Sequence, residues 1–286
     1  MKTSSVIINA CVGLGLLTSN AFAQSGKPVF VGKIGVQAYT FRSSMPKATI
    51  AVLDTIKAMG ITELEGQEPK GMTPEAFRKL CNERGISIPS IGAGYDDIVK
   101  SPAQVVKQAK ALGAKYVMVA WIPHGKEFTL EDAKKAVTDF NTVGKYLAEA
   151  GITFCYHNHG YEFGPYEDGT LFDYIAKNTD PKYVSFEIDL LWSFHGGQDP
   201  AKLIEKYPTR IKLMHLKDIR KGVANDLTGG TDTKNDVALG TGQIDIPAVL
   251  KAARKAGVRH YFIEDESPSY ATQIPVTIEY IKGLKY

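Results

Sequence analysis

The stretch KYLAEAGITFCYHNHG, residues 145–160, decides the fold. An amphipathic segment ends at Gly151, a short apolar run follows, and that run ends in polar side chains. Glycine tolerates the left-handed conformation that ends a helix, and a short apolar run after such a stop is typical of a buried strand. The stretch therefore predicts a helix that leads into a buried strand with a polar tip.

The same pattern recurs along the whole chain. Strands are predicted at residues 34–41, 61–65, 86–91, 116–121, 152–158, 184–189, 211–216 and 261–264. Helices are predicted at residues 47–59, 74–84, 103–112, 130–150, 171–178, 200–206 and 247–256. Glycines stand between a predicted helix and the next strand at Gly60, Gly85, Gly113, Gly151 and Gly257. This alternation predicts a single (β/α)8 TIM barrel in the α/β class. An open doubly wound sheet is disfavoured, because no glycine-rich phosphate loop follows the first predicted strand.

Two predicted connections are longer than the others. They cover residues 93–101 and 217–245, and the second is rich in Gly, Thr, Asp and Asn. Long βα connections of a barrel lie on its active-site face. We expect both to be irregular loops on that face, where such loops often act as lids.

The N-terminus differs in character from the rest of the chain. Lys2 precedes an apolar stretch at residues 6–17, and Ala21-Phe22-Ala23 follows. A basic start, an apolar stretch and an A-x-A site are typical of a secretory signal peptide. The sequence thus predicts a signal peptide at 1–23, a barrel domain at 24–286, and a periplasmic or secreted protein with no membrane segment after cleavage.

Composition argues against some kinds of partner. The 286 residues contain 34 Lys and Arg against 31 Asp and Glu, without a run of like charge. Neither a nucleic-acid surface nor a membrane surface is indicated. Cys11 lies in the predicted signal peptide, whereas Cys81 and Cys155 fall in separate predicted elements, so both are expected to be free thiols. The sequence makes no prediction of the oligomeric state.

Polar side chains gather at the ends of four consecutive predicted strands. In chain order they are His157 and His159, with Glu162 beyond them, then Glu187 and Asp189, His215 and Lys217, and Glu264 and Glu266. The paired residues of each tip are two apart and share a face of the strand. Barrel active sites form at these C-terminal tips, and buried charges need a partner. One divalent cation, Mn²⁺, Mg²⁺, Co²⁺ or Zn²⁺, would satisfy such a mixed oxygen and nitrogen set.

Several segments resemble the xylose-isomerase-like TIM barrel superfamily. They are YHNHGYEF (156–163), FEIDLLW (186–192), LIEKYPTRIKLMHLKD (203–218), LGTGQID (239–245) and HYFIEDES (260–267). Within the superfamily the chain is most similar to the sugar phosphate isomerase/epimerase group and its inosose-dehydratase-like branch. The resemblance runs from about residue 35 to the C-terminus.

The resemblance implies a metal site made by a Glu, an Asp, a His and a Glu on strands five to eight. Asp189, His215 and Glu264 match the last three positions, but His157 stands where the isomerases carry the strand-five Glu. Two interpretations follow. Glu162 folds back as the carboxylate ligand and leaves His157 as a base, or His157 itself binds the metal. The first is preferred because it keeps three anionic ligands.

The departure at His157 bears on the reaction. The isomerases and epimerases are implied to use two opposed glutamates, whereas inosose-dehydratase-like members carry a His-rich strand five. A His base beside a polarised carbonyl removes the adjacent proton, and a leaving group β to the carbonyl then makes the reaction an elimination. Lys217 would stabilise the enolate or protonate the leaving group, with Glu264 as the further catalytic residue; alternatively, Lys217 forms a structural ion pair with Asp218 or Glu187.

Export and the lack of an Arg cluster favour an unphosphorylated keto-sugar or 3-keto-glycoside as the substrate. The residues expected to bind it are His159, Glu187, Trp192, Trp121, Tyr39 and Glu266. Phe41, Tyr161 and Phe194 are further aromatic residues near the predicted mouth that could stack on a sugar. The prediction is a metal-dependent lyase or dehydratase. The alternatives are a sugar isomerase or epimerase acting through an enediolate, an endonuclease-like enzyme with several zinc ions, and a non-catalytic sugar-binding barrel.

Overall fold

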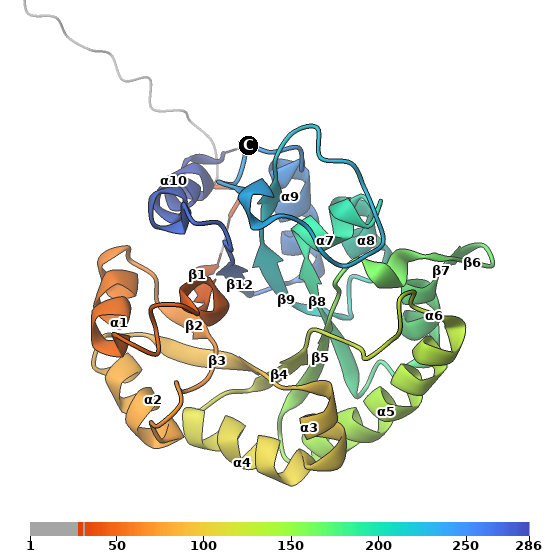
Figure 1. Ribbon diagram of the computed structural model, residues 1–286, viewed down its shortest axis with the longest axis horizontal. Helices are drawn as coiled ribbons and strands as arrows, with labels where there is room; N and C mark the ends of the chain where they lie inside the picture. Colours follow the sequence, from red (N-terminus) through yellow and green to blue (C-terminus); the bar gives the residue numbers. More distant parts are fainter. Residues whose placement is uncertain (1–27, 31, 286) are drawn as a thin grey trace, which may run out of the picture.

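A closed barrel of eight parallel strands forms the centre of the molecule (Figure 1). The structure, a computed structural model, describes residues 28–30 and 32–285, so the predicted signal peptide and Cys11 lie outside the described residues. Around the barrel the strands are β1 (Lys33–Gln37), β12 (His260–Ile263), β9 (Ile211–Leu216), β8 (Val184–Asp189), β5 (Thr153–His157), β4 (Tyr116–Val119), β3 (Ser87–Gly92) and β2 (Glu63–Glu65). The eight predicted strands and the barrel are confirmed.

Helices surround the barrel on its outside (Figure 1). They are α1 (Thr49–Ala58), α2 (Pro74–Asn82), α3 (Tyr95–Lys100), α4 (Pro102–Leu112), α5 (Leu130–Glu149), α6 (Leu171–Asn178), α7 (Leu190–His195), α8 (Pro200–Lys206), α9 (Ile246–Ala256) and α10 (Tyr270–Gly283). The seven predicted helices are present. All five glycines predicted to end helices have φ between 72° and 85°, a conformation that costs other residues more than glycine.

The sequence-based assignment is wrong at the end of the first strand and at residues 93–101, and it omits two helices. The first predicted strand, 34–41, ends at Gln37, and Ala38–Phe41 forms the short 3-10 helix η1. The Gln37 side chain accepts a hydrogen bond from the Tyr39 backbone N–H at 3.1 Å and so starts the turn. Residues 93–101, expected to be irregular, contain α3, because Tyr95 and Ile98 are buried against the core. Helices α7 and α10 were also missed.

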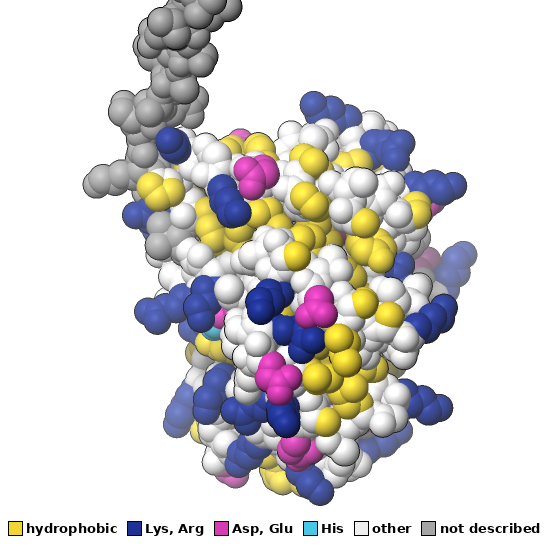
Figure 2. Space-filling view, turned by 90° about the vertical axis from the view of Figure 1, so that its left-hand side faces the viewer, with side chains coloured by type: hydrophobic (Ala, Val, Ile, Leu, Met, Phe, Trp, Pro, Cys, Tyr) yellow, Lys and Arg dark blue, Asp and Glu magenta, His cyan; other side chains and the backbone are white. Residues whose placement is uncertain are grey.

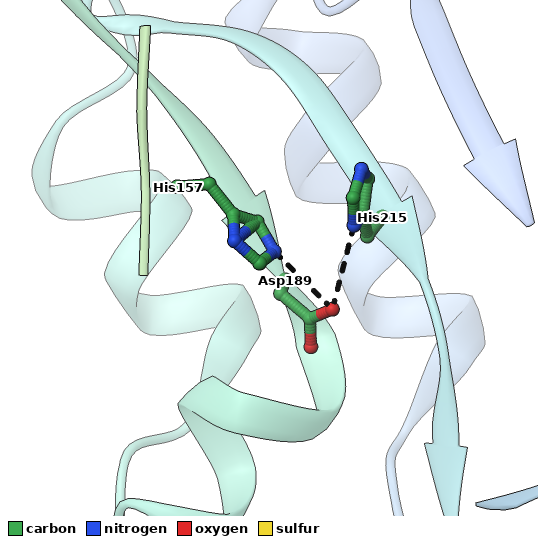
Figure 3. Close-up of side chains that lie close together, drawn as sticks. All are labelled: His157, Asp189 and His215. Atoms are coloured by element: carbon green, nitrogen blue, oxygen red, sulfur yellow. Dashed lines mark ion pairs between the residues drawn. The ribbon is translucent and has the colours of Figure 1, made fainter. Parts of the chain in front are cut away.

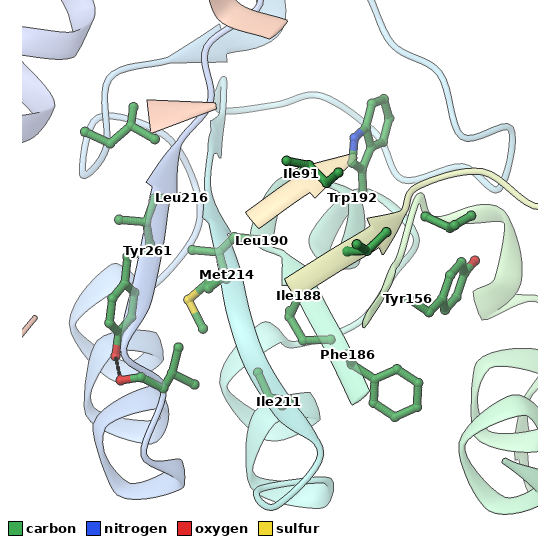
Figure 4. Close-up of a cluster of buried hydrophobic side chains, with 14 of the residues drawn as sticks. Ile91, Tyr156, Phe186, Ile188, Leu190, Trp192, Ile211, Met214, Leu216 and Tyr261 are labelled. Carbon is green, nitrogen blue, oxygen red and sulfur yellow. Dashed lines mark hydrogen bonds between the residues drawn. The ribbon is translucent and has the colours of Figure 1, made fainter. Parts of the chain in front are cut away.

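Side chains alternate along each strand between the barrel interior and the helices outside. On β8, Phe186 and Ile188 belong to the large core between strands and helices (Figure 4), whereas Glu187 and Asp189 have the opposite parity. The interior has its own apolar layer, formed by Met118, Cys155, Leu213 and Phe262. The layer is tightly packed: a Cβ on Gly35 would lie 2.6 Å from the Phe262 ring. The barrel is therefore filled below its C-terminal end.

The long connection 217–245 is tied down at both ends by one carboxylate. It contains a small hairpin of β10 (Asp218–Ile219) and β11 (Asp236–Val237), with the short helix η3 (Thr233–Asn235) between them. The buried Asp218 carboxylate accepts hydrogen bonds of 2.9–3.2 Å from the backbone N–H groups of Ile219, Gly240, Gly242 and Ile244. The roots of the connection are thereby fixed beside the barrel mouth.

The face shown in Figure 2 carries charges of both signs, with Lys and Arg side chains spread among acidic and apolar ones. Cys81 and Cys155 are buried free thiols, as predicted. Among the helices of the described residues, none has the length and apolar character needed to cross a bilayer.

Candidate metal and substrate site

A cavity of about 700 Å³ opens at the C-terminal ends of the strands. Its floor includes His157, His215 and Glu264, and its walls come from the connections that follow the strands. Gly229, Gly230, Thr231, Thr233 and Asp236 of the long connection also line it, which places that connection over the mouth. The cavity is thus bounded by the predicted polar tips on one side and by loops on the others.

Three of the predicted residues meet at the bottom of this cavity (Figure 3). His157 on β5 and His215 on β9 lie on either side of Asp189, the last residue of β8. The Asp189 Oδ2 atom is 3.5 Å from His157 Nε2 and 3.7 Å from His215 Nδ1. The other oxygen, Oδ1, accepts a hydrogen bond of 2.8 Å from the Trp192 N–H and caps α7. This cap orients Asp189 so that Oδ2 faces the two imidazoles.

Glu264 completes the ligand group, a name used below for His157, Asp189, His215 and Glu264. Its Oε2 atom is 3.1 Å from His215 Nδ1. Two ligands about 2.1 Å from one ion lie about 3.0–3.4 Å apart at angles of 90–110°. Three separations in the ligand group, between neighbouring members in the order His157, Asp189, His215 and Glu264, are 3.1–3.7 Å and close to this range.

Buried atoms without hydrogen bonds support the same interpretation. Asp189 Oδ2 and both ring nitrogens of His157 have no hydrogen-bond partner among the described residues. Burying such atoms without compensation is costly. The four residues therefore fit a divalent cation.

The opposite side of the His215 ring faces a different pair of carboxylates. His215 Nε2 is 2.6 Å from Glu65 Oε1 and 3.4 Å from Glu187 Oε1, and all three side chains are buried. A separation of 2.6 Å is the length of a short charge-assisted hydrogen bond and is too small for two ligands of one ion. We therefore assign Glu65 as a hydrogen-bond acceptor of His215, not as part of a second ion site.

Sequence comparison identifies the family. A profile described as xylose isomerase-like TIM barrel matches residues 53–284. The chain belongs to this family.

Individual relatives of the xylose isomerase-like barrel include inosose dehydratases. The chain is 27% identical to the inosose dehydratase of Lacticaseibacillus casei over 198 residues, which are 62% of this chain and 65% of that protein. It is 30% identical to the enzyme of Geobacillus thermodenitrificans over 158 residues, or 50% of this chain and 51% of that one. The chain thus spans less than two thirds of either relative's length.

Solved structures share the fold of this xylose isomerase-like barrel. A sugar phosphate isomerase/epimerase from Parabacteroides distasonis has a TM-score of 0.71 at 23% identity, covering 88% of this chain and 94% of that one. The IolI protein with a bound zinc atom has a TM-score of 0.70 at 15% identity, covering 87% and 96%. At these identities the likeness shows the fold alone.

Glu162, the predicted fourth ligand, lies elsewhere in this xylose isomerase-like barrel. Its Oε1 atom accepts hydrogen bonds from the Tyr156 hydroxyl at 2.7 Å and from the His159 N–H at 2.9 Å. The Tyr156 ring packs on Phe140 of α5, so Glu162 is held on the outer side of β5. The structure therefore does not bring Glu162 into the ligand group, and His157 takes the strand-five position.

Replacing Glu162 with Gln tests this placement. Burial raises the pKa of Glu162 to about 7, against a weaker opposing effect of its hydrogen bonds. Between pH 4.5 and 7 the folded protein holds a proton that the unfolded chain has lost, so wild-type stability falls as the pH rises. Glu162→Gln keeps an acceptor for Tyr156 and His159 but cannot ionise. From pH 5 to 8 its free energy of unfolding should improve by about 2–3 kcal/mol relative to wild type in urea titrations.

Metal affinity in the same Glu162→Gln protein separates the two interpretations of strand five. It should match wild type if His157 is the ligand. A large loss of affinity would instead make Glu162 the ligand and refute its placement on the outer side of β5.

Lys217 is a fully buried cation beside the ligand group. Its Nζ atom is 2.8 Å from Glu266, 3.4 Å from Glu264 and 3.7 Å from Asp236. Burial opposes its charge, but Glu264 and Asp236 outweigh burial and raise the pKa of Lys217 well above its ordinary value. A structural ion pair of Lys217 with Asp218 or Glu187 was the alternative prediction, but neither residue is an ion-pair partner of Lys217. The Asp218 carboxylate instead accepts hydrogen bonds from backbone N–H groups.

Burial and neighbouring charges shift the pKa values of residues in the ligand group. Burial, and then the nearby His215, hold the pKa of His157 well below its usual range, so His157 is neutral. Burial opposes the ionisation of Glu264, but Lys217 and His215 outweigh it and keep the pKa of Glu264 well below its usual range. Burial opposes the charge of His215, but Glu187 and the other carboxylates around its ring outweigh burial and raise the pKa of His215 well above its usual range. Since a cation binds a neutral imidazole and an ionised carboxylate, a bound cation would replace one proton of His215.

The predicted substrate-binding residues are only partly brought together. Tyr39, His159, Trp192 and Glu266 line the cavity, and His159 stacks on Trp192 with ring centroids 4.6 Å apart. Burial lowers the pKa of His159 to about 4, so its ring is neutral. Trp121 is 43% exposed and contacts the His159 ring from outside the cavity lining.

The remaining residues proposed for sugar contacts lie away from the cavity lining. Glu187 lies beneath the floor beside His215. Phe41 and Tyr161 are buried in the core, and Phe194 is partly buried against it. These three aromatic side chains therefore pack in or against the core and do not line the cavity.

Sequence reasoning missed several residues of the site. Glu65 and Gln37 could have been found, since each is a polar residue at the inward position of a buried strand end. Arg42 lines the cavity and lies 3.7 Å from Glu266, and Asp236 reaches Lys217 from β11. No pattern in the sequence singles out the last two, because they come from connections whose paths the sequence does not define.

Proposed function

We propose that this protein is a divalent-metal-dependent lyase that eliminates a leaving group β to the carbonyl of a keto-sugar. The observation that carries the proposal is the ligand group: the buried side chains of His157, Asp189 and His215 converge within reach of one ion, with unpartnered atoms between them, and Glu264 lies against His215. Inosose dehydratases among the relatives and the zinc atom in the IolI protein support it.

His157, Asp189, His215 and Glu264 would hold the cation, and this assignment replaces the hypothesis that His157 is the base. When bound, the cation would polarise the substrate carbonyl and acidify the adjacent C–H. The chain itself supplies an anionic oxygen in Glu264 and a cationic acid in Lys217, 3.4 Å apart. Glu264 lines the cavity and would be the base, and Lys217, buried directly against Glu264, would be the acid.

The elimination needs one proton removed and one delivered. Glu264 takes the proton from the carbon next to the carbonyl, and the C–H electron pair forms the new C=C bond. The bond from the β carbon to the leaving oxygen breaks with its electron pair, and Lys217 donates a proton to that oxygen. Glu266 and Asp236 hold the Lys217 ammonium in place. In a 3-keto-glycoside the carbon that loses the proton is C2 and the β carbon is C1, so the aglycone departs with the leaving oxygen.

The cavity favours a glycoside over a free monosaccharide. The connections after β1 and β2 line the cavity with Tyr39, Met45, Pro46 and Pro69, and also with Arg42 and Gln67. An apolar aglycone would bury surface against the apolar side chains of this wall, and Arg42 and Gln67 would offer hydrogen bonds to sugar hydroxyls. We therefore place the ketone at the ligand group and the aglycone against Tyr39.

Product analysis in D₂O tests the proposal and its alternative, isomerisation or epimerisation through an enediolate. A phenyl 3-keto-glucoside, free 3-keto-glucose and 2-keto-inositol would be incubated with metal-loaded protein and followed by NMR. We expect release of phenol from the glycoside and faster turnover of it than of the free sugar. Deuterium incorporation without loss of a substituent would establish epimerisation instead. Unchanged turnover after EDTA treatment, or binding with no turnover of any ketone, would refute the proposal.

We further propose that residues 1–23 direct export and are cleaved after Ala23. The support is the pattern of Lys2, the apolar stretch 6–17 and Ala21-Phe22-Ala23. N-terminal sequencing of protein recovered from the periplasm or medium should begin at Gln24. Protein that retains its first residues and stays in the cytoplasm would contradict export.

A further inference from the structure

A chain of hydrogen bonds runs from the cavity wall to the ligand group beneath it. The Tyr39 N–H donates to Gln37 Oε1 at 3.1 Å, and Gln37 Nε2 donates to Glu65 Oε1 at 2.7 Å. The same Glu65 oxygen accepts from His215 Nε2 at 2.6 Å. Gln37, Glu65 and His215 are 6%, 0% and 1% exposed, so water does not compete for these bonds.

The hydrogen bond between His215 and Glu65 determines which ring nitrogen of His215 can bind a cation. A neutral imidazole has one N–H donor and one lone pair, on different nitrogens. A carboxylate can only accept, so the bond to Glu65 places the hydrogen on His215 Nε2. Nδ1 faces Asp189 and Glu264, so a cation bound there would replace the proton on Nδ1 and take the lone pair of that nitrogen, while Nε2 keeps its hydrogen toward Glu65. Partners of this kind fix the tautomer and the ring orientation of metal-binding histidines.

Gln37 fixes Glu65 in the same way. Its NH₂ group must face the carboxylate, and its carbonyl oxygen accepts from Tyr39, so the amide has one orientation that satisfies both contacts. Tyr39 lies on η1 and lines the cavity. The turn that carries this part of the wall is therefore bonded through two side chains to a predicted metal ligand.

We propose that Glu65 is a positioning residue that holds His215 with Nδ1 directed at the cation, and that Gln37 in turn holds Glu65. The proposal rests on the metal dependence proposed above, because it assigns Glu65 a role only toward a bound cation. It predicts that Glu65 controls cation affinity without being a ligand.

The test is the Co²⁺ affinity of Glu65→Gln, measured on EDTA-treated and dialysed protein by absorbance titration with a competing chelator. Glutamine has the same shape as glutamate, but its amide can donate to His215 Nε2 and favour the tautomer with the hydrogen on Nδ1. We expect affinity to fall by about 10- to 100-fold while circular dichroism and the unfolding transition stay close to wild type. Gln37→Leu removes one link and should lower affinity by about 3- to 10-fold.

Glu63→Gln is the matched control on the same strand. Glu63 has the same parity as Glu65, is 2% exposed, and accepts a hydrogen bond from His260 Nδ1 at 2.8 Å at the other end of the barrel interior. The Glu63→Gln protein loses the same kind of Glu–His contact, but away from the ligand group, and should bind Co²⁺ as wild type does.

The outcomes separate this proposal from the one on which it rests. Wild-type protein that binds no Co²⁺ would refute the metal dependence itself. Wild-type binding that is unchanged in both Glu65→Gln and Gln37→Leu would refute the positioning role alone. An equal loss of affinity in Glu63→Gln would also refute it, since the effect would then be a general one on the barrel. If Glu65→Gln does not fold, Gln37→Leu decides in its place.

Discussion

Replacing His215 with alanine should abolish cation binding and lower kcat/KM by about a thousandfold or more, because a cation of this kind contributes several kcal/mol to transition-state stabilisation. His215 lies at the centre of the site: Nδ1 is 3.1 Å from Glu264, and Nε2 is 2.6 Å from Glu65. The loss of His215 removes one ligand of the cation, and without the cation several buried carboxylates lose the positive charge that they would share. Metal content after dialysis and initial rates on the keto-glycoside measure the two effects.

His260→Ala is the control for this variant. His260 is on the neighbouring strand β12 and is also paired with a buried glutamate, Glu63, but at the end of the barrel away from the cavity. It should retain its metal and most of its rate. Full activity in His215→Ala, or full activity of wild type in EDTA, would show that the ligand group does not bind a catalytic cation.

Replacing Lys217 with methionine should lower kcat by about 10²- to 10⁴-fold while leaving metal content unchanged, because the side chain acts as an acid and not as a ligand. Methionine preserves much of the bulk of the side chain, which packs over the Trp192 ring at 5.4 Å. The Lys217 ammonium is the shared ion-pair partner of Glu264, Glu266 and Asp236, so its removal should also lower the thermal stability. Rates at saturating substrate and metal analysis on the same preparation separate these effects.

Lys212→Met provides the comparison on the same strand. Lys212 lies near the start of β9, and its Nζ donates to the Thr209 carbonyl at 3.0 Å on the surface. It should behave as wild type in rate and metal content. A Lys217→Met protein with an undiminished kcat would exclude Lys217 as the acid and leave it a structural cation.

The barrel was predictable because its signals are local. Each strand is a short apolar run, and each of five helices before a strand ends at a glycine with positive φ. Asp189, His215 and Glu264 were predictable for a related reason: a charged residue at the tip of a buried strand needs a partner. Strand order and register then bring the three tips together without further information.

The parts that could not be predicted depend on contacts between distant segments. Glu162 was expected in the ligand group, but Tyr156, on the outward face of β5, binds it instead. Asp236 is separated from Lys217 by most of the long connection, and only the hairpin pairing of β10 with β11 brings it within 3.7 Å. Glu65 was within reach of the parity argument, since Glu63 and Glu65 alternate with Leu64, but a strand end without a histidine stands out less than the tips of β5 and β9.

The single carboxylate of Asp218 makes the connection after β9 a replaceable module. Four backbone N–H groups, from positions 219, 240, 242 and 244, converge on it, so both roots of the segment are fixed independently of what lies between them. Insertions or exchanges within residues 221–232 would reshape the side of the cavity formed by Gly229 and Gly230 while sparing the tips of the strands. Evolution of new selectivity in this barrel can therefore proceed by loop grafting, with the reactive floor inherited unchanged.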